Sequence, residues 1–103
     1  MAPEHKTGDG VLEETRQKTK QPTLYKVLLL NDDYTTMEFV IQILEGIFHK
    51  TPSAAYRIMM QVHTEGRGIC GAYSYDVAET KVATTQELAQ KAGFPLQATL
   101  EEE

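Results

Sequence analysis

Apolar residues occur with two different spacings along the chain, and these spacings predict its strands and helices. The run from Thr23 to Leu30 is rich in apolar and β-forming residues, which is typical of a buried strand. The turn-forming segment Asn31–Thr35 follows, and it indicates that the strand ends there. After this turn, apolar side chains recur three and four positions apart, as expected for a helix with one buried face: Met37, Val40, Ile41, Leu44, Ile47 and Phe48.

Residues that favour helix ends predict the limits of the first two helices. Thr35 or Thr36 is expected to cap the start of the first helix. The His49–Lys50 pair is expected in its last turn, where positive charge is favourable. The Thr51–Pro52 pair then predicts the start of a second helix, which ends at the glycine-containing segment Gly66–Gly68.

Shorter patterns predict the rest of the domain. A strand is expected over Ile69–Tyr73, and Ser74 can cap a third helix that ends at Gly93. The buried face of this helix is predicted from residues at helical spacing: Ala78, Val82, Thr85 and Ala89. A last strand is expected over Leu96–Leu100. The order β-α-α-β-α-β predicts an α+β domain, with three helices on a small three-stranded antiparallel sheet.

The first 22 residues differ in composition from the rest of the chain. Residues 1–22 contain few apolar side chains and nearly balanced charges. Such a segment buries too little apolar surface to offset the entropy lost on ordering. We therefore expect a disordered N-terminal arm over residues 1–22 and a single folded domain over residues 23–103.

Composition and charge exclude several classes of protein. Fifteen acidic and ten basic residues give a net charge of −5, which argues against nucleic acid as a partner. The longest apolar run, Val27–Leu30, is far shorter than the ~20 residues of a membrane span, so no membrane association is expected. The N-terminus has no apolar stretch typical of a signal peptide. A single cysteine, Cys70, cannot form an internal disulfide, and a reducing, cytoplasmic location is expected.

A polar cluster follows the first predicted strand. Asn31, Asp32 and Asp33 are an amide and two carboxylates that lie between a buried strand and a helix. Turn formation and helix capping are the simplest roles for such residues. A calcium loop would need alternating acidic positions and a distant glutamate, which are missing. Neither a nucleophile nor a set of metal ligands accompanies the carboxylates, so acid–base catalysis is also poorly supported.

Methionine, valine and histidine residues share faces of the first two predicted helices. Met59, Val62 and His63 are separated by three and four positions, and Met37 and Val40 share a face of the preceding helix. Packing in the core explains such a pattern in most proteins. The alternative is an apolar pocket with one polar residue at its edge, for which the flexible methionine side chain is well suited.

The remaining candidates give weaker signals. The histidines and Cys70 lack the spacing of a zinc site, and no cofactor-binding motif is present, so neither metal nor cofactor is expected. Cys70 lies in an apolar segment and is expected to be buried and inert. The mixed charges of Asp76–Lys81 suit either a solvated helix face or a surface that docks a partner.

Several segments together resemble one known family. The resemblance rests on separated blocks that occur in order: Tyr25–Thr35, Met37–Val40, Ile69–Gly71, Val77–Val82 and Pro95–Glu101. These blocks are similar to those of the ClpS family, the bacterial adaptors that present N-end-rule substrates to the Clp protease. The similarity extends over residues 23–102. It implies a non-enzymatic adaptor that binds protein N-termini with a bulky hydrophobic first residue: Leu, Phe, Tyr or Trp.

The resemblance also implies roles for residues in the two helical faces and the polar cluster. Asn31, Asp33 and His63 would hold the α-amino group of the bound N-terminus. The pocket for the first side chain would be lined by seven residues: Asp32, Thr35, Met37, Val40, Met59, Val62 and Leu96. An ammonium group needs acceptors, and a carboxylate, an amide carbonyl and a neutral imidazole nitrogen can supply three.

Partners follow from the same resemblance. Asp76, Glu79 and Lys81 would lie on or near the face that docks on the N-terminal domain of the ATPase ClpA. The arm of residues 1–22 would assist substrate hand-over. Two positions depart from the family pattern, because Thr36 replaces a common proline and Asp76 replaces the usual glutamate.

Two other classes of protein compete with this interpretation. A non-catalytic interaction domain like the C-terminal domain of the ribosomal stalk protein would have a similar fold, but it lacks the combination of Asn31, Asp33 and His63. A small thiol or acid–base enzyme would need an activating partner for Cys70 or Asp33, and the sequence offers none.

Overall fold

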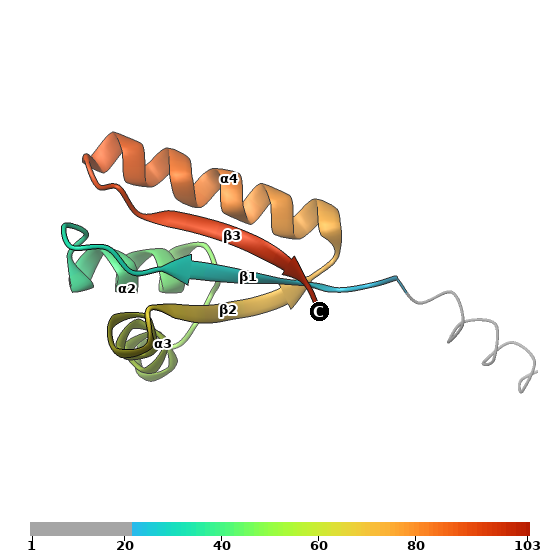
Figure 1. Cartoon of the computed structure of the whole chain (residues 1–103), viewed down its shortest axis with the longest axis horizontal. Helices are drawn as coiled ribbons and strands as arrows, with labels where there is room; N and C mark the ends of the chain where they lie inside the picture. Colours follow the sequence, from blue (N-terminus) through green and yellow to red (C-terminus); the bar gives the residue numbers. More distant parts are fainter. Residues whose placement is uncertain (1–21) are drawn as a thin grey trace, which may run out of the picture.

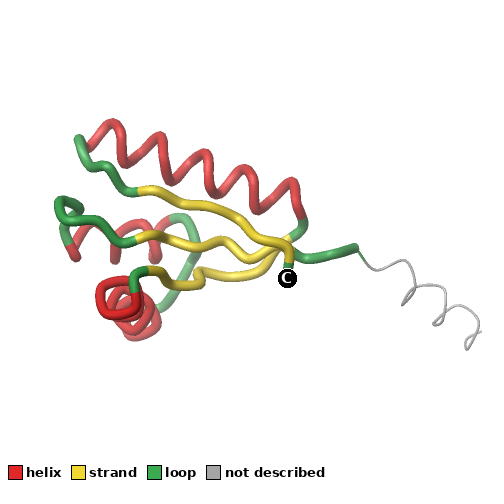
Figure 2. Tube along the Cα trace, in the orientation of Figure 1, coloured by secondary structure: helices red, strands yellow, loops and turns green. Residues whose placement is uncertain are grey.

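The predicted order of helices and strands is confirmed. The computed structural model describes residues 22–103, and Figures 1 and 2 show their arrangement. The elements are β1 (Tyr25–Leu30), α2 (Met37–Gly46), α3 (Pro52–Glu65), β2 (Arg67–Tyr73), α4 (Tyr75–Ala92) and β3 (Gln97–Glu102). Of the expected arm, residues 1–21 lie outside the described part of the chain. None of the helices within residues 22–103 combines the length and apolar character needed to cross a membrane.

The sheet is antiparallel, and β1 is its central strand. The strand order is β2-β1-β3, so that β1 pairs with both neighbours. Leu28 lies opposite Ile69 on one side and Thr99 on the other. Because β1 is central, the turn that follows Leu30 begins in the middle of one end of the sheet (Figure 1).

The helices cover one face of the sheet, and the core lies between them. Val27 and Leu29 are fully buried and belong to a cluster with residues from α2, α3 and α4: Val40, Ile43, Leu44, Ala55, Met59, Val62, Ala78 and Ala89. Leu28 points to the opposite face, because side chains alternate along a strand. It is still only 1% exposed. On this face the Arg67–Glu101 ion pair, with a 3.0 Å N–O distance, joins β2 to β3 across β1.

Threonine caps start α2 and α3 as the sequence predicts. The Thr36 hydroxyl accepts a hydrogen bond from the Phe39 N–H at 3.1 Å, and the Thr51 hydroxyl accepts one from the Ala54 N–H at 3.2 Å. Helix α3 ends at Gly66, whose φ of 92° lies in the left-handed region that glycine adopts at little cost. Ser74 occupies the cap position of α4, but its side chain makes no capping hydrogen bond.

Some predicted boundaries are wrong by a few residues. Helix α2 ends at Gly46, so that His49 and Lys50 lie beyond its last turn. His49 has a positive φ of 56°, and the Lys50 N–H donates to the Leu44 carbonyl, which folds the chain back. Strand β2 begins at Arg67, because Arg67 and Gly68 pair with Leu30 and Leu29. The predicted helix-ending role of Gly68 is therefore incorrect.

Candidate functional site

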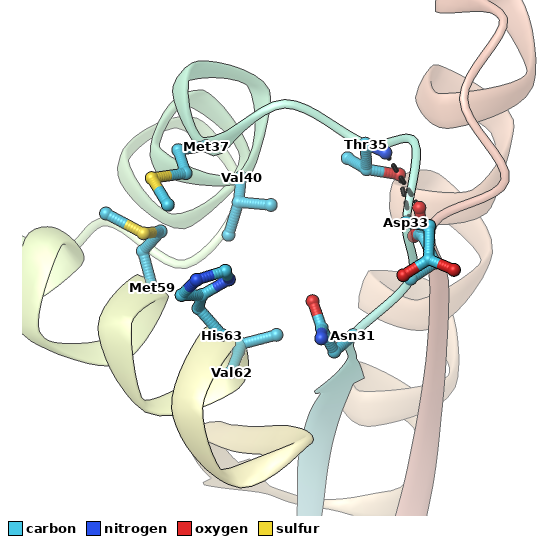
Figure 3. A pocket seen from close by; sticks show the side chains of 9 residues that line it. Asn31, Asp33, Thr35, Met37, Val40, Met59, Val62 and His63 are labelled. Carbon is cyan, nitrogen blue, oxygen red and sulfur yellow. Dashed lines mark hydrogen bonds between the residues drawn. The ribbon is translucent and has the colours of Figure 1, made fainter.

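A cavity of about 240 Å³ opens at the end of the sheet where β1 stops. The turn after β1, the first turn of α2 and the second half of α3 enclose it (Figure 3). Nine residues line it: Asn31, Asp32, Asp33, Thr35, Met37, Val40, Met59, Val62 and His63. All nine are among the residues that the sequence analysis singled out.

The turn that carries the polar residues is held together by Asp32. Its Oδ1 accepts hydrogen bonds from the backbone N–H groups of Tyr34 at 2.8 Å and Thr35 at 2.7 Å. Its Oδ2 accepts one from the Thr35 hydroxyl at 2.7 Å. Burial alone would raise the pKa of Asp32, but these hydrogen bonds outweigh it and lower the pKa below the usual value. Asp32 therefore serves as an internal acceptor that shapes the turn.

Three polar side chains form the rim of the cavity. The Asn31 N–H donates to the Gly66 carbonyl at 2.9 Å, which ties the end of β1 to the end of α3. His63 lies in the last turn of α3, so this backbone bond brings Asn31 and His63 to the same side of the cavity (Figure 3). Asp33 follows Asp32 in the turn and is exposed. The rim therefore offers a carboxylate, an amide and an imidazole to one small volume.

Apolar side chains form the wall of the cavity. Val40 of α2 and Met59 and Val62 of α3 are 3–6% exposed, so this wall is continuous with the core. Met37 is the first residue of α2 and is 46% exposed at the mouth of the cavity. Both methionine side chains reach toward each other from the two helices (Figure 3). The arrangement combines a polar rim with an adjustable apolar wall.

Leu96 is not among the residues that line this cavity. It is 4% exposed and packs in the core just before β3. The predicted role of Leu96 in lining the cavity is therefore wrong. Pro95 and Gln97, which flank Leu96, lie beside Asn31 and Asp32 in an adjoining cavity, and the sequence analysis did not predict this.

The three residues expected to dock the ATPase lie at the far end of the molecule. Asp76 and Glu79 are exposed in the first turns of α4, near the start of β1 (Figure 1). The Tyr75 hydroxyl donates to Glu79 at 3.4 Å, and the Tyr75 ring packs on Tyr25 with ring centroids 5.2 Å apart. Lys81 points inward instead: its Nζ donates to the Ile47 carbonyl at 2.7 Å.

Groups suited to thiol or metal chemistry are not part of this site within the described residues. Cys70 is buried as expected, and burial raises the pKa of its thiol to about 12, so that the reactive thiolate is disfavoured. Within residues 22–103, no group of three or more histidine, cysteine, aspartate or glutamate side chains is arranged to hold a metal ion. What the cavity offers is hydrogen-bond acceptors next to an apolar space.

Comparison with known proteins identifies a family. The family model described as "ATP-dependent Clp protease adaptor protein ClpS" matches residues 20–99. The chain is 56% identical over 96 residues to the ClpS adapter protein of Maricaulis maris, covering 93% of this chain and 88% of that one. It is 49% identical to the ClpS adapter protein of Rhodospirillum centenum, with both chains covered completely.

A solved structure supports the same relationship. The structure of Agrobacterium tumefaciens ClpS2 bound to L-phenylalaninamide superposes with a TM-score of 0.78 at 43% sequence identity. The match covers 81% of this chain and 100% of that one. Family model, relatives and fold therefore agree, and the chain belongs to the ClpS family of adaptor proteins of the ATP-dependent Clp protease.

Proposed function

We propose that this adaptor binds the free N-terminus of a protein whose first residue is bulky and hydrophobic, and delivers that protein to the ATPase ClpA of the ClpAP protease. The observation that carries the proposal is one cavity in which a polar rim and an apolar wall meet. An N-terminal residue has the matching pair of groups, because its ammonium and its side chain leave the same carbon atom.

The rim fits the ammonium group. An N-terminal ammonium has one positive charge and three hydrogens to donate. Asp33 supplies a carboxylate, while Asn31 and His63 supply an amide carbonyl and an imidazole nitrogen. Hydrogen bonds between charged partners are roughly twice as strong as neutral ones. An internal peptide segment has no ammonium, so the rim favours chain ends.

The wall fits a large apolar side chain. Burying a leucine or phenylalanine side chain contributes roughly 1.5–3 kcal/mol, whereas a small side chain gains little. Met37 and Met59 can adjust to flat and branched shapes because the thioether chain is flexible. The ligand of Agrobacterium tumefaciens ClpS2, L-phenylalaninamide, has both a free amine and a phenyl ring. Leu, Phe, Tyr and Trp are the side chains that we expect to be accepted.

Delivery requires a second surface that leaves the cavity open. Asp76 and Glu79 are exposed at the end of the molecule away from the cavity, where they can contact the N-terminal domain of ClpA. Lys81 does not point into this surface, because its ammonium donates to the Ile47 carbonyl. A reduced, buried Cys70 suits the cytoplasm, where such a protease would work. The chain's own role is binding and presentation, without a catalytic step.

A peptide pair that differs only at the N-terminus tests the proposal. A fluorescent peptide that begins with Phe should bind, and the same peptide with an acetylated N-terminus should lose nearly all affinity. Acetylation removes the charge and leaves acceptors without donors, which costs about 1–3 kcal/mol per group. Fluorescence anisotropy measures both affinities. Equal binding of the two peptides would overturn the proposal.

A further inference from the structure

A second cavity adjoins the candidate site. It has a volume of about 220 Å³ and is lined by Leu30, Asn31, Asp32, Pro95 and Gln97. Asn31 and Asp32 also line the first cavity, so these two residues form a wall that both cavities share. The first cavity extends from this wall to α2 and α3, and the second extends to the segment that enters β3.

The two cavities lie on different sides of the end of β1. Strand β1 has β2 on one side and β3 on the other, and α3 packs against β2. In Figure 3, Asn31 and Asp33 stand between α3, which carries His63, and the pale red strand β3. A chain that crosses Asn31 and Asp32 therefore has one cavity on each side.

An extended peptide has the geometry to use both cavities. Successive side chains of an extended chain point in opposite directions. If the first side chain enters the cavity between α2 and α3, the second points away from it. The space on that other side of Asn31 and Asp32 is the second cavity.

We propose that the cavity formed by Leu30, Pro95 and Gln97 is a subsite for the second residue of the bound N-terminus. This inference rests on the proposed function and adds a specificity determinant to it. Pro95 and Leu30 offer apolar surface, and the exposed Gln97 amide can both donate and accept hydrogen bonds. The subsite therefore favours a side chain with an apolar stem and an amide head, and glutamine is the best match.

Gln97 is suited to this role by its place in the strand. It is the first residue of β3, and its backbone pairs with Leu30. Its side chain is exposed, so a substitution leaves the core and the β1–β3 ladder intact. The Asp32 carboxylate is already engaged by Thr35 and Tyr34, and the proposed function assigns the Asn31 amide to the ammonium. Gln97 is then the remaining hydrogen-bonding side chain of this cavity that can distinguish second residues.

The test compares two peptides on two proteins. Peptides that begin Phe-Gln and Phe-Ala, otherwise identical, are titrated into the wild-type chain and into Gln97→Ala. In the wild type, Phe-Gln should bind about three- to tenfold more tightly than Phe-Ala, which is the range that one net hydrogen bond supplies. Gln97→Ala should remove this difference and leave the affinity for Phe-Ala unchanged. Gln42→Ala is the matched control, because Gln42 is also an exposed glutamine but lines a different groove, between α2 and α4.

A charge-altering variant gives an independent readout. Gln97→Lys should raise the affinity for a Phe-Glu peptide relative to Phe-Gln, and this gain should shrink in high salt. Gln42→Lys should leave the ratio unchanged. If Phe peptides bind but the second residue and Gln97 have no linked effect, the subsite is wrong and the proposed function stands. If no Phe peptide binds at all, the proposed function itself fails.

Discussion

Two adjacent carboxylates in the same turn have different roles. Asp32 accepts three hydrogen bonds from the turn itself, whereas Asp33 is exposed at the rim of the cavity. The resemblance to the ClpS family assigned Asp33 to the ammonium and Asp32 to the pocket lining, but the residues alone do not distinguish the two neighbouring aspartates. The hydrogen bonds that Tyr34 and Thr35 donate engage Asp32 in the turn, whereas Asp33 is the carboxylate that the proposed function assigns to the ammonium.

Substitutions at the two positions should therefore act differently. Asp33→Asn should weaken the binding of a Phe peptide roughly tenfold or more, because it replaces a charged hydrogen bond by a neutral one. Its melting temperature should stay that of the wild type. Asp32→Asn should lower the melting temperature as well as the affinity, because one carboxylate oxygen becomes a donor that cannot accept from Thr35. Anisotropy and thermal denaturation distinguish the two. Identical effects of the two substitutions would refute the assignment.

The branching of the ligand's first side chain should also affect its affinity. In Figure 3, Val40 and Val62 point into the space between Asn31 and the two methionines. In the proposed binding mode, we expect the first Cβ of a bound chain to lie close to these stiff side chains. Peptides that begin with Leu should bind roughly tenfold more tightly than those that begin with its isomer Ile, whose branched Cβ cannot rotate away from the clash. Peptides that begin with norvaline and with its branched isomer valine form a second pair, in which norvaline should bind more tightly for the same reason. Ile binding as tightly as Leu would contradict this description of the cavity.

At the scale of elements, Lys81 connects α4 to the end of α2. Its Nζ donates to the Ile47 carbonyl at 2.7 Å and lies 5.6 Å from the Phe48 ring centroid and 5.2 Å from that of Tyr73. A helix end has unpaired carbonyls and a partial negative charge, which a cation stabilises. The sequence analysis expected His49 and Lys50 to supply this charge. A residue more than thirty positions away supplies it instead.

Removing the Lys81 ammonium should destabilise the fold. Lys81→Met keeps the apolar stem but loses the hydrogen bond and the cation–π contacts, so we expect a loss of about 1–2 kcal/mol in the free energy of unfolding. Lys91→Met is the control, because Lys91 is exposed in the same helix and pairs with Glu87 at 3.8 Å. Urea denaturation measures both. A Lys81→Met variant as stable as the control would show that the contact has no structural role.

The ends of the helices show how much of the fold could be predicted from the sequence. Capping at Thr36, Thr51 and Gly66 is local chemistry: Thr51 was predicted outright, Thr36 was one of two candidates, and Gly66 was predicted together with Gly68. The end of α2 was not predicted. Ile47 and Phe48 continue the helical spacing and pack on the core, although the helix has already ended before them. Spacing reports which side chains are buried, whereas the backbone of this segment turns where the Lys50 N–H donates to the Leu44 carbonyl and Lys81 donates to the Ile47 carbonyl.

The same distinction applies to the cavity. The residues that line it fall on two helical faces and one turn, which local patterns single out, but their place around one cavity was expected only from the resemblance to the ClpS family. The second cavity was not predicted, because Pro95 and Gln97 meet Asn31 and Asp32 only when β3 pairs with β1. That pairing joins positions more than sixty residues apart. No spacing along the chain indicates it.

At the scale of the whole molecule, the two proposed functional surfaces lie at opposite ends of the sheet. The cavity opens where β1 ends, while Asp76 and Glu79 lie near the start of β1 (Figure 1). The described chain enters β1 at that second end, and the Tyr25 ring packs on Tyr75 there. The described chain therefore begins at the end of the sheet where the proposed docking surface lies.

Deleting residues 1–20 should therefore separate binding from delivery. The affinity for a Phe peptide should not change, because every residue that lines either cavity lies between Leu30 and Gln97. Degradation of a folded substrate with an N-terminal Phe by ClpAP should slow severalfold or more, because we propose that the arm assists hand-over. Anisotropy measures the first quantity, and loss of substrate fluorescence with time measures the second. The deleted protein should still bind the isolated N-terminal domain of ClpA, whereas a Glu79→Lys variant of the full chain should not. Loss of peptide binding on deletion would mean that the arm contributes to the site. Undiminished degradation would mean that residues 1–20 are a passive extension, and the docking surface on α4 would then be enough for delivery.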